Sequence, residues 1–178
     1  MDYVFSGVIG FLTSLIASIA FLFFILYNLR PKIGISHYIV KGTDLDSGAT
    51  AYFFKFVNYS KFQAFDVRIR LSELIRMPTD GGKINTRRKD LTLKKAFIAH
   101  VPAFIPTANI TTYAPHAIQF TCLDDLQPIL KDKHRSVEVQ IILKHGLTGL
   151  AQVFDYEYSE IDNVKTKEWP FGNELTIS

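Results

Sequence analysis

The feature that most constrains this chain is an uninterrupted apolar segment near its N-terminus. Residues Tyr3 to Leu29 carry no charged side chain, and Asp2 and Arg30 stand on either side of them. As an α-helix, these 27 residues would reach about 40 Å, more than the roughly 30 Å hydrocarbon core of a bilayer. We therefore expect residues 1–30 to form one transmembrane helix, with the lipid bilayer as a partner.

The charges around the apolar segment predict its orientation. No basic residue precedes it and the segment is about twice as long as the apolar part of a removable signal peptide, so we expect it to be retained. Arg30, Lys32 and Lys41 follow it. The positive-inside rule then places the N-terminus outside and residues 31–178 in the cytoplasm, where an unpaired Cys122 is ordinary.

Small residues gather on one side of the predicted helix. A stripe with spacings of four, three, four and three residues contains Ser6, Gly10, Thr13, Ala17 and Ala20, and Phe24 continues it. Small residues let helix backbones approach closely, which is how helices associate in lipid. We predict self-association through this stripe, as a ring rather than a dimer because the stripe is wide. In a ring, Ser6 and Thr13 would line a pore and Phe24 would constrict its cytoplasmic end. A plain monomeric anchor is the alternative.

The residues after the helix predict an all-β domain. Between residues 65 and 71, apolar side chains alternate with charged ones, which is typical of a strand with one face in water. A short helix is expected within residues 123–130, near Pro128. Prolines separate short strands, a pattern that indicates an immunoglobulin-like sandwich over residues 31–178. The predicted strands are Ile33–Val40, Ala49–Val57, Phe65–Leu71, Ala117–Cys122, Val137–Leu143, Leu150–Tyr158 and Leu175–Ile177.

Signatures of catalysis are missing from the sequence. The five histidines occur singly, without a second His or Cys at metal-ligand spacing, and no nucleophile or phosphate-loop motif is present. We therefore expect no enzymatic activity, no catalytic residues, no metal site and no cofactor.

Basic residues gather in two short segments. Between Lys83 and Lys95 there are six positive charges and one acidic residue, Asp90, and a second group occupies residues 131–135. Arginine forms paired hydrogen bonds with phosphate and lysine supplies point charges, so the first segment predicts a site for a phosphate-rich ligand such as a DNA oligomer. A solvated loop and a contact with anionic lipid head groups are the alternatives. The candidate ligand-binding residues are Arg87, Arg88, Lys89, Lys94 and Lys95.

Part of the predicted sandwich resembles the cytoplasmic domain of inward-rectifier potassium channels. The similar stretches are residues 54–71, residues 137–161 and the segment Lys-Glu-Trp-Pro-Phe-Gly at 167–172. The resemblance implies an immunoglobulin-like sandwich that assembles as a tetramer beneath a pore. The sequence has no second span, pore helix or glycine-rich selectivity filter, so potassium selectivity is not implied.

The layout of one span, a sandwich and a basic segment also resembles the membrane effectors of bacterial antiphage systems, most of all the channel-forming effectors of the Hailong system. This resemblance implies a homotetramer in the bacterial inner membrane, held shut by a DNA oligomer that a partner nucleotidyltransferase makes. The expected function is thus a ligand-gated ion channel or pore in antiphage defence. The alternative is a membrane-anchored accessory module without channel activity, which binds proteins through its sheet edges or the surface at Phe53 and Phe54.

Overall fold

The computed structural model describes residues 2–28, 30–109 and 113–177, and their contacts divide the chain into two units, residues 1–30 and 31–178. The first unit is the helix α1 (Asp2–Asn28). Its residues Tyr3–Tyr27 are long and apolar enough to cross a membrane, and none of the most apolar part is buried. This is the single N-terminal helix that the apolar segment predicts.

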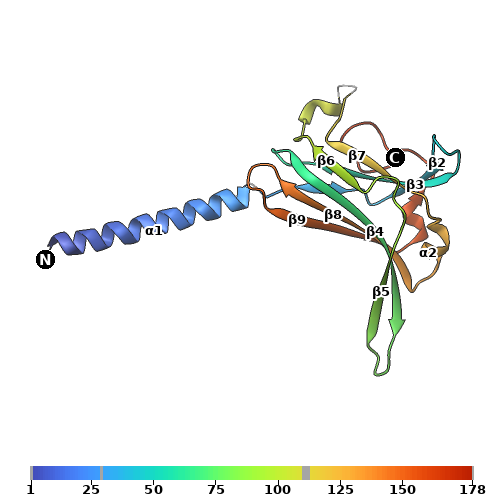
Figure 1. The fold of residues 1–178 in the computed structure, drawn as a ribbon, viewed down its shortest axis with the longest axis horizontal. Coiled ribbons are helices and arrows are strands. Elements are labelled where there is room, and N and C mark those ends of the chain that lie inside the picture. Colours follow the sequence, from blue (N-terminus) through green and yellow to red (C-terminus); the bar gives the residue numbers. More distant parts are fainter. Residues whose placement is uncertain (1, 29, 110–112, 178) are drawn as a thin grey trace. The chain divides into compact units, whose positions relative to one another are not determined.

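The second unit is a β-sandwich, and its first sheet is built around β3 (Figure 1). The strand β3 pairs antiparallel with β7 along one edge and with β1 and then β2 along the other. The short β10 joins β2 in parallel. The strands of this sheet are β1 (Ile33–Ile35), β2 (Ile39–Thr43), β3 (Thr50–Asn58), β7 (Ala117–Cys122) and β10 (Val164–Lys165).

The second sheet is antiparallel and is built around the 15-residue strand β4. One edge of β4 pairs with β8, while its other edge pairs first with β6 and then with β5. The strand β9 lies outside β8. The strands of this sheet are β4 (Ala64–Pro78), β5 (Ile84–Asp90), β6 (Phe97–Val101), β8 (Arg135–His145) and β9 (Ala151–Tyr158).

The hydrophobic core lies between the two sheets. Phe54 of β3 stacks on Phe120 of β7, and it meets Tyr158 of β9 edge to face across the sandwich, with 5.6 Å between ring centroids. Cys122 is fully buried in this core, as its apolar strand predicts. The apolar helix followed by a β-sandwich confirms the fold class predicted from the sequence.

A short helix, α2 (Gln127–Lys131), adds Ile129 and Leu130 to the core. Pro128 occupies its first turn, where a missing N–H donor costs nothing because that group would have no partner within the helix. Two 3₁₀ turns complete the described elements, η1 (Pro106–Asn109) and η2 (Ile161–Asn163). The helix predicted near Pro128 is therefore confirmed, in a shorter form.

The ends of β4 and β5 form a two-stranded ribbon that extends beyond the rest of the sandwich (Figure 1). Every residue of β5 is exposed. Gly81 and Gly82 form the turn with φ values of 83° and 73°, which residues with a side chain rarely adopt. The basic segment is thus mostly a strand and differs from the solvated loop that was one alternative from the sequence.

The segment 169–175, called here the C-terminal strap, covers part of the outer face of the first sheet. Lys55 of β3 is 3% exposed, and its Nζ donates hydrogen bonds to the carbonyls of Pro170 at 3.0 Å and Glu174 at 2.7 Å. Burial lowers the pKa of Lys55. The strap is therefore attached through single hydrogen bonds of its carbonyls and of the Trp169 side chain to Ser36, rather than through a further strand.

Two predicted strands differ in the structure. Leu175–Ile177 forms no strand, because the carbonyl of Leu175 accepts a hydrogen bond from the Ser36 hydroxyl instead of joining a ladder. Residues 33–40 form two strands, β1 and β2, because the chain between them turns to bond through Ser36. The strands β5, β6 and β10 are additional to those predicted.

Candidate functional site

The six residues of the predicted helix-packing stripe lie on α1 and are all exposed. The Thr13 hydroxyl donates to the Ile9 carbonyl at 2.7 Å, so it is satisfied within the helix. A Cβ built on Gly10 meets no heavy atom within 4 Å. The helix therefore has room at Gly10 for the backbone of a neighbouring helix. The stripe comprises Ser6, Gly10, Thr13, Ala17, Ala20 and Phe24.

Three of the predicted ligand-binding residues, Arg87, Arg88 and Lys89, lie in succession on β5. Because side chains alternate along a strand, Arg87 and Lys89 share one face of the second sheet and Arg88 lies on the other. The structure therefore does not present these three cations as a single surface.

Arg88 is engaged in the fold. It pairs across the second sheet with Glu138 of β8, with 3.0 Å between Nη2 and Oε2. Glu138 is almost completely buried, and the ion pair lies on the outer face of the sheet together with Ser72 and Asp90. The charge of Arg88 is thus largely balanced within the protein.

Arg87 belongs to a row that crosses three strands. Ile75 of β4 is the register partner of Arg87 on β5 and of Arg135 on β8, so the two arginines point to the same face on either side of it. Arg135 pairs with Glu73, whose side chain is 1% exposed and which is the register partner of Lys89. Among the described residues, Arg87 and Lys89 form no ion pair.

The second basic segment lies across β4 from the first. The carbonyl of His134 accepts a hydrogen bond from the backbone N–H of Arg76 at 2.8 Å, which places residues 132–135 on one edge of β4 and β5 on the other. We call this surface the basic corner. It comprises Arg87 and Lys89 from β5 and Arg135 at the start of β8.

Lys94 and Lys95 lie outside the basic corner, because the chain changes sheets after β5. Leu93 forms an isolated bridge with Cys122 of the first sheet, and the N–H of Lys94 donates to the carbonyl of Thr121 at 2.9 Å. Lys95, the next residue, is exposed. The sequence-adjacent cations are thus divided between the two sheets.

The side chain of Lys94 pairs with two acidic residues of the β2–β3 turn. Its Nζ lies 2.7 Å from Asp44 Oδ1 and 2.5 Å from Asp46 Oδ2. The hydrogen bond to Asp44 raises the pKa of Lys94 and lowers the pKa of Asp44. Lys94 therefore fixes the β2–β3 turn. Two carboxylates balance its charge, so a phosphate would have to compete with them.

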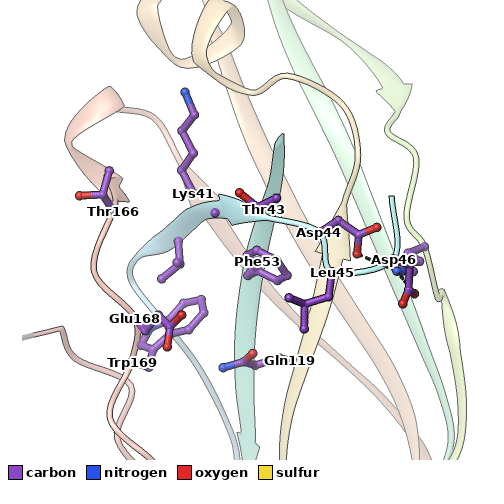
Figure 2. Close-up of a pocket in the computed structure, with 13 residues that line it drawn as sticks. Lys41, Thr43, Asp44, Leu45, Asp46, Phe53, Gln119, Thr166, Glu168 and Trp169 are labelled. Atoms are coloured by element: carbon purple, nitrogen blue, oxygen red, sulfur yellow. Dashed lines mark hydrogen bonds and ion pairs between the residues drawn. The ribbon is translucent and has the colours of Figure 1, made fainter. Parts of the chain in front are cut away.

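This ion pair borders a cleft of about 440 Å³ on the outer face of the first sheet. Figure 2 shows the Phe53 ring in the middle of the cleft, with Leu45 on the β2–β3 turn at one side and Trp169 at the other. Gln119 of β7 lines it as well. The sequence does not predict this cleft. Its one indication of it is the protein-binding surface proposed at Phe53 and Phe54.

Of the two phenylalanines in that surface, Phe53 is half-buried and lines the cleft, whereas Phe54 is fully buried in the core. The described residues hold no group of three or more His, Cys, Asp or Glu side chains that is arranged to bind a metal ion. Comparison of the sequence with protein-family models and with curated proteins finds no match.

Proposed function

We propose that this protein is a homo-oligomeric membrane effector in which the single helices form or gate a pore and the β-sandwich binds a phosphate-rich ligand. In this proposal the protein is a tetramer of the bacterial inner membrane with the sandwich in the cytoplasm. It acts in antiphage defence, and its ligand is a DNA oligomer made by a partner nucleotidyltransferase.

The observation that carries the proposal is the exposed small-residue stripe of α1. Gly10 and Ala17 offer a surface on which another helix backbone packs closely, and the Thr13 hydroxyl is already bonded to its own helix. Phe24 lies on the same stripe toward the C-terminal end of α1, where a ring of phenylalanines would narrow a pore.

The basic corner supports the part of the proposal that concerns the phosphate-rich ligand. Arg87 and Lys89 have no acidic partner among the described residues, and both are exposed on β5. A polyanion bound to the corners of several subunits would favour one packing of the sandwiches over others. Its removal would shift that equilibrium, and the helices would repack.

The test is leakage of a trapped dye from liposomes that carry the purified full-length protein, with and without single-stranded DNA oligomers. We expect leakage that responds to the oligomer and that Gly10→Leu abolishes, because a leucine on the stripe separates the helices. The matched control is Val8→Leu, which adds bulk to the opposite, large-residue side of α1 and leaves leakage unchanged. Liposomes that stay tight under every condition would refute the channel.

The cleft favours a second candidate, the membrane-anchored module that binds proteins. Phe53 is half-buried in the cleft, and Leu45 at its rim is 99% exposed, so the cleft offers an apolar contact surrounded by charged residues. In this alternative, liposomes stay tight, Gly10→Leu leaves binding of the partner protein unchanged, and Phe53→Ser abolishes that binding. Gly10→Leu and Phe53→Ser therefore discriminate between the two functions.

A further inference from the structure

The chain enters the β-sandwich at one end, which the backbone bonds of Lys32 identify. Its N–H donates to the Ser60 hydroxyl at 2.8 Å, and its carbonyl accepts from the N–H of Tyr59 at 2.7 Å. Lys32 is therefore fixed against the β3–β4 turn, residues 59–63. We call this the entry end of the sandwich.

Connectivity limits how far the entry end can be from the membrane. Five peptide units join Tyr27, the last residue of the candidate span, to Lys32, and a fully extended chain of that length covers about 18 Å at most. If α1 crosses a bilayer, as the proposed function requires, the entry end stays within that distance of the point where the span ends.

The β8–β9 turn lies at the same end. The N–H of Gly146 donates to the carbonyl of Gln63 at 2.9 Å, and the rings of Phe62 and His145 meet edge to face, with 5.2 Å between centroids. A Cβ on Gly146 would lie 2.4 Å from the Gln63 carbonyl oxygen, so the contact depends on a glycine here. The two turns are thus packed together.

The tip of the β8–β9 turn is apolar and well ordered by its own bonds. Leu147 is 59% exposed and Leu150 is 57% exposed. The backbones of His145 and Leu150 are joined at 2.9 Å, and the N–H of Thr148 donates to Nδ1 of the buried His145. Two leucines are therefore held at the surface by a turn that is closed by hydrogen bonds to His145 and Thr148.

Cations accompany these leucines at the entry end. Lys32 and Lys61 are exposed, and neither forms an ion pair within the part of the chain that the structure describes. Apolar side chains beside lysines match the boundary of a bilayer, where acyl chains meet anionic phosphates. Water is a poorer environment for both leucines than this boundary.

We propose that the β8–β9 turn docks on the bilayer, with Leu147 and Leu150 inserted at the level of the head groups and Lys32 and Lys61 facing lipid phosphates. This contact is additional to α1. It restrains the sandwich at a second point, and it differs from a phosphate site at the basic corner because its main contribution is apolar.

The test places a fluorescent label on one cysteine at a time in the full-length protein, reconstituted in vesicles of phosphatidylcholine and phosphatidylglycerol. The native Cys122 is fully buried, and burial raises the pKa of its thiol to about 11, so it stays unreactive at neutral pH. Leu147→Cys carries the probe. The control is Leu45→Cys, an exposed leucine in the turn at the other end of β3, about 26 Å away along the nine-residue strand.

We expect lipid-borne nitroxides to quench the Leu147 label and to leave the Leu45 label bright, whereas aqueous iodide gives the reverse. Equal access of iodide to both labels overturns the proposal. A Leu147 label protected from iodide and from the nitroxides also overturns it, because a protein copy then covers the turn.

A third label, at Leu15→Cys on α1, separates this proposal from the proposed function. A Leu15 label that lipid nitroxides quench, together with a Leu147 label that they do not, refutes the docked turn alone. A Leu15 label that stays bright refutes the membrane span, and the docked turn is refuted with it when the Leu147 label also stays bright.

Discussion

Arg88 and Glu138 are joined by an ion pair that crosses from β5 to β8 over β4, with 3.0 Å between Nη2 and Oε2. Arg87, the residue before Arg88, lies on the opposite face of the second sheet, in the row with Ile75 and Arg135. Two adjacent arginines therefore have different roles, one within the fold and one toward solvent. This difference gives the first two predictions.

We expect Arg87→Gln with Lys89→Gln to weaken binding of a single-stranded DNA oligomer. If each cation neutralises one phosphate, the slope of log binding constant against log salt concentration falls by about 1.4 for the two substitutions together. A salt titration of fluorescence anisotropy measures that slope. An unchanged slope would exclude the basic corner as the ligand site.

We expect Arg88→Gln to act mainly on stability. It leaves the nearly buried Glu138 carboxylate without its cation, which costs about 1–3 kcal/mol in the free energy of unfolding. Urea denaturation gives the difference. Arg87→Gln is the matched control, since it removes an exposed arginine from the same strand. Equal stability of both variants would show that the ion pair contributes nothing.

We expect Ala17→Leu to break up the oligomer in detergent without loss of helix content. Ala17 is exposed on α1, so the leucine finds space in the single chain and interferes only with a neighbouring helix. Light scattering measures the mass and circular dichroism the helix content. Ile16→Leu, one position away from the stripe, serves as the control, and identical masses would favour the plain anchor.

We expect Gly146→Ala to destabilise the sandwich by about 1–3 kcal/mol, because its Cβ would lie 2.4 Å from a backbone oxygen that cannot move away cheaply. Gly42→Ala is the comparison, since its Cβ would lie 3.1 Å from the ring of Phe53. That ring is half-buried at the cleft and has room to shift, so the cost is smaller. Denaturation midpoints that rank the other way would contradict this geometry.

We expect the sandwich to lose stability on mild acidification through His145. Burial lowers the pKa of His145 below its ordinary value of 6.5. Well above pH 6.5 the imidazole is neutral in both the folded and the unfolded states. As the pH falls below 6.5, the unfolded chain takes up the proton first, so the free energy of unfolding declines until the lower folded pKa is reached.

Urea denaturation between pH 7.5 and 5 measures this decline. His145→Asn is the control, because its side chain offers an acceptor to the N–H of Thr148 and does not titrate. A pH dependence that is the same in both proteins would assign the effect to other groups.

The sequence predicts most of the fold where apolar residues recur with a regular period. The long apolar helix α1 and the strands that became β3, β7, β8 and β9 are of this kind. The strand β5 could not be predicted in this way, because all its residues are exposed and its conformation depends on pairing with the long β4. The C-terminal strap is similar, since hydrogen bonds of single residues attach it, partly through carbonyl groups, and these leave no periodic pattern in the sequence.

The candidate ligand site shows the same limit. Arg87 and Lys94 are close in sequence, yet the bridge between Leu93 and Cys122 carries the chain to the other sheet between them. Arg87 and Arg135 are far apart in sequence and share a row beside Ile75. Clustering along the chain indicates where charge is available, but only strand register determines which charges act together.

The attachment of Lys55 to the C-terminal strap also bears on biosynthesis. Its two carbonyl partners come 115 and 119 residues later in the chain, so the strap cannot cover Lys55 until the ribosome has synthesised nearly all of the sandwich. By then α1 has long been available to the insertion machinery. Contacts between such distant residues also form slowly. If α1 crosses a membrane as proposed, its insertion therefore precedes closure of the domain, and the sandwich completes its fold on a chain that is already anchored.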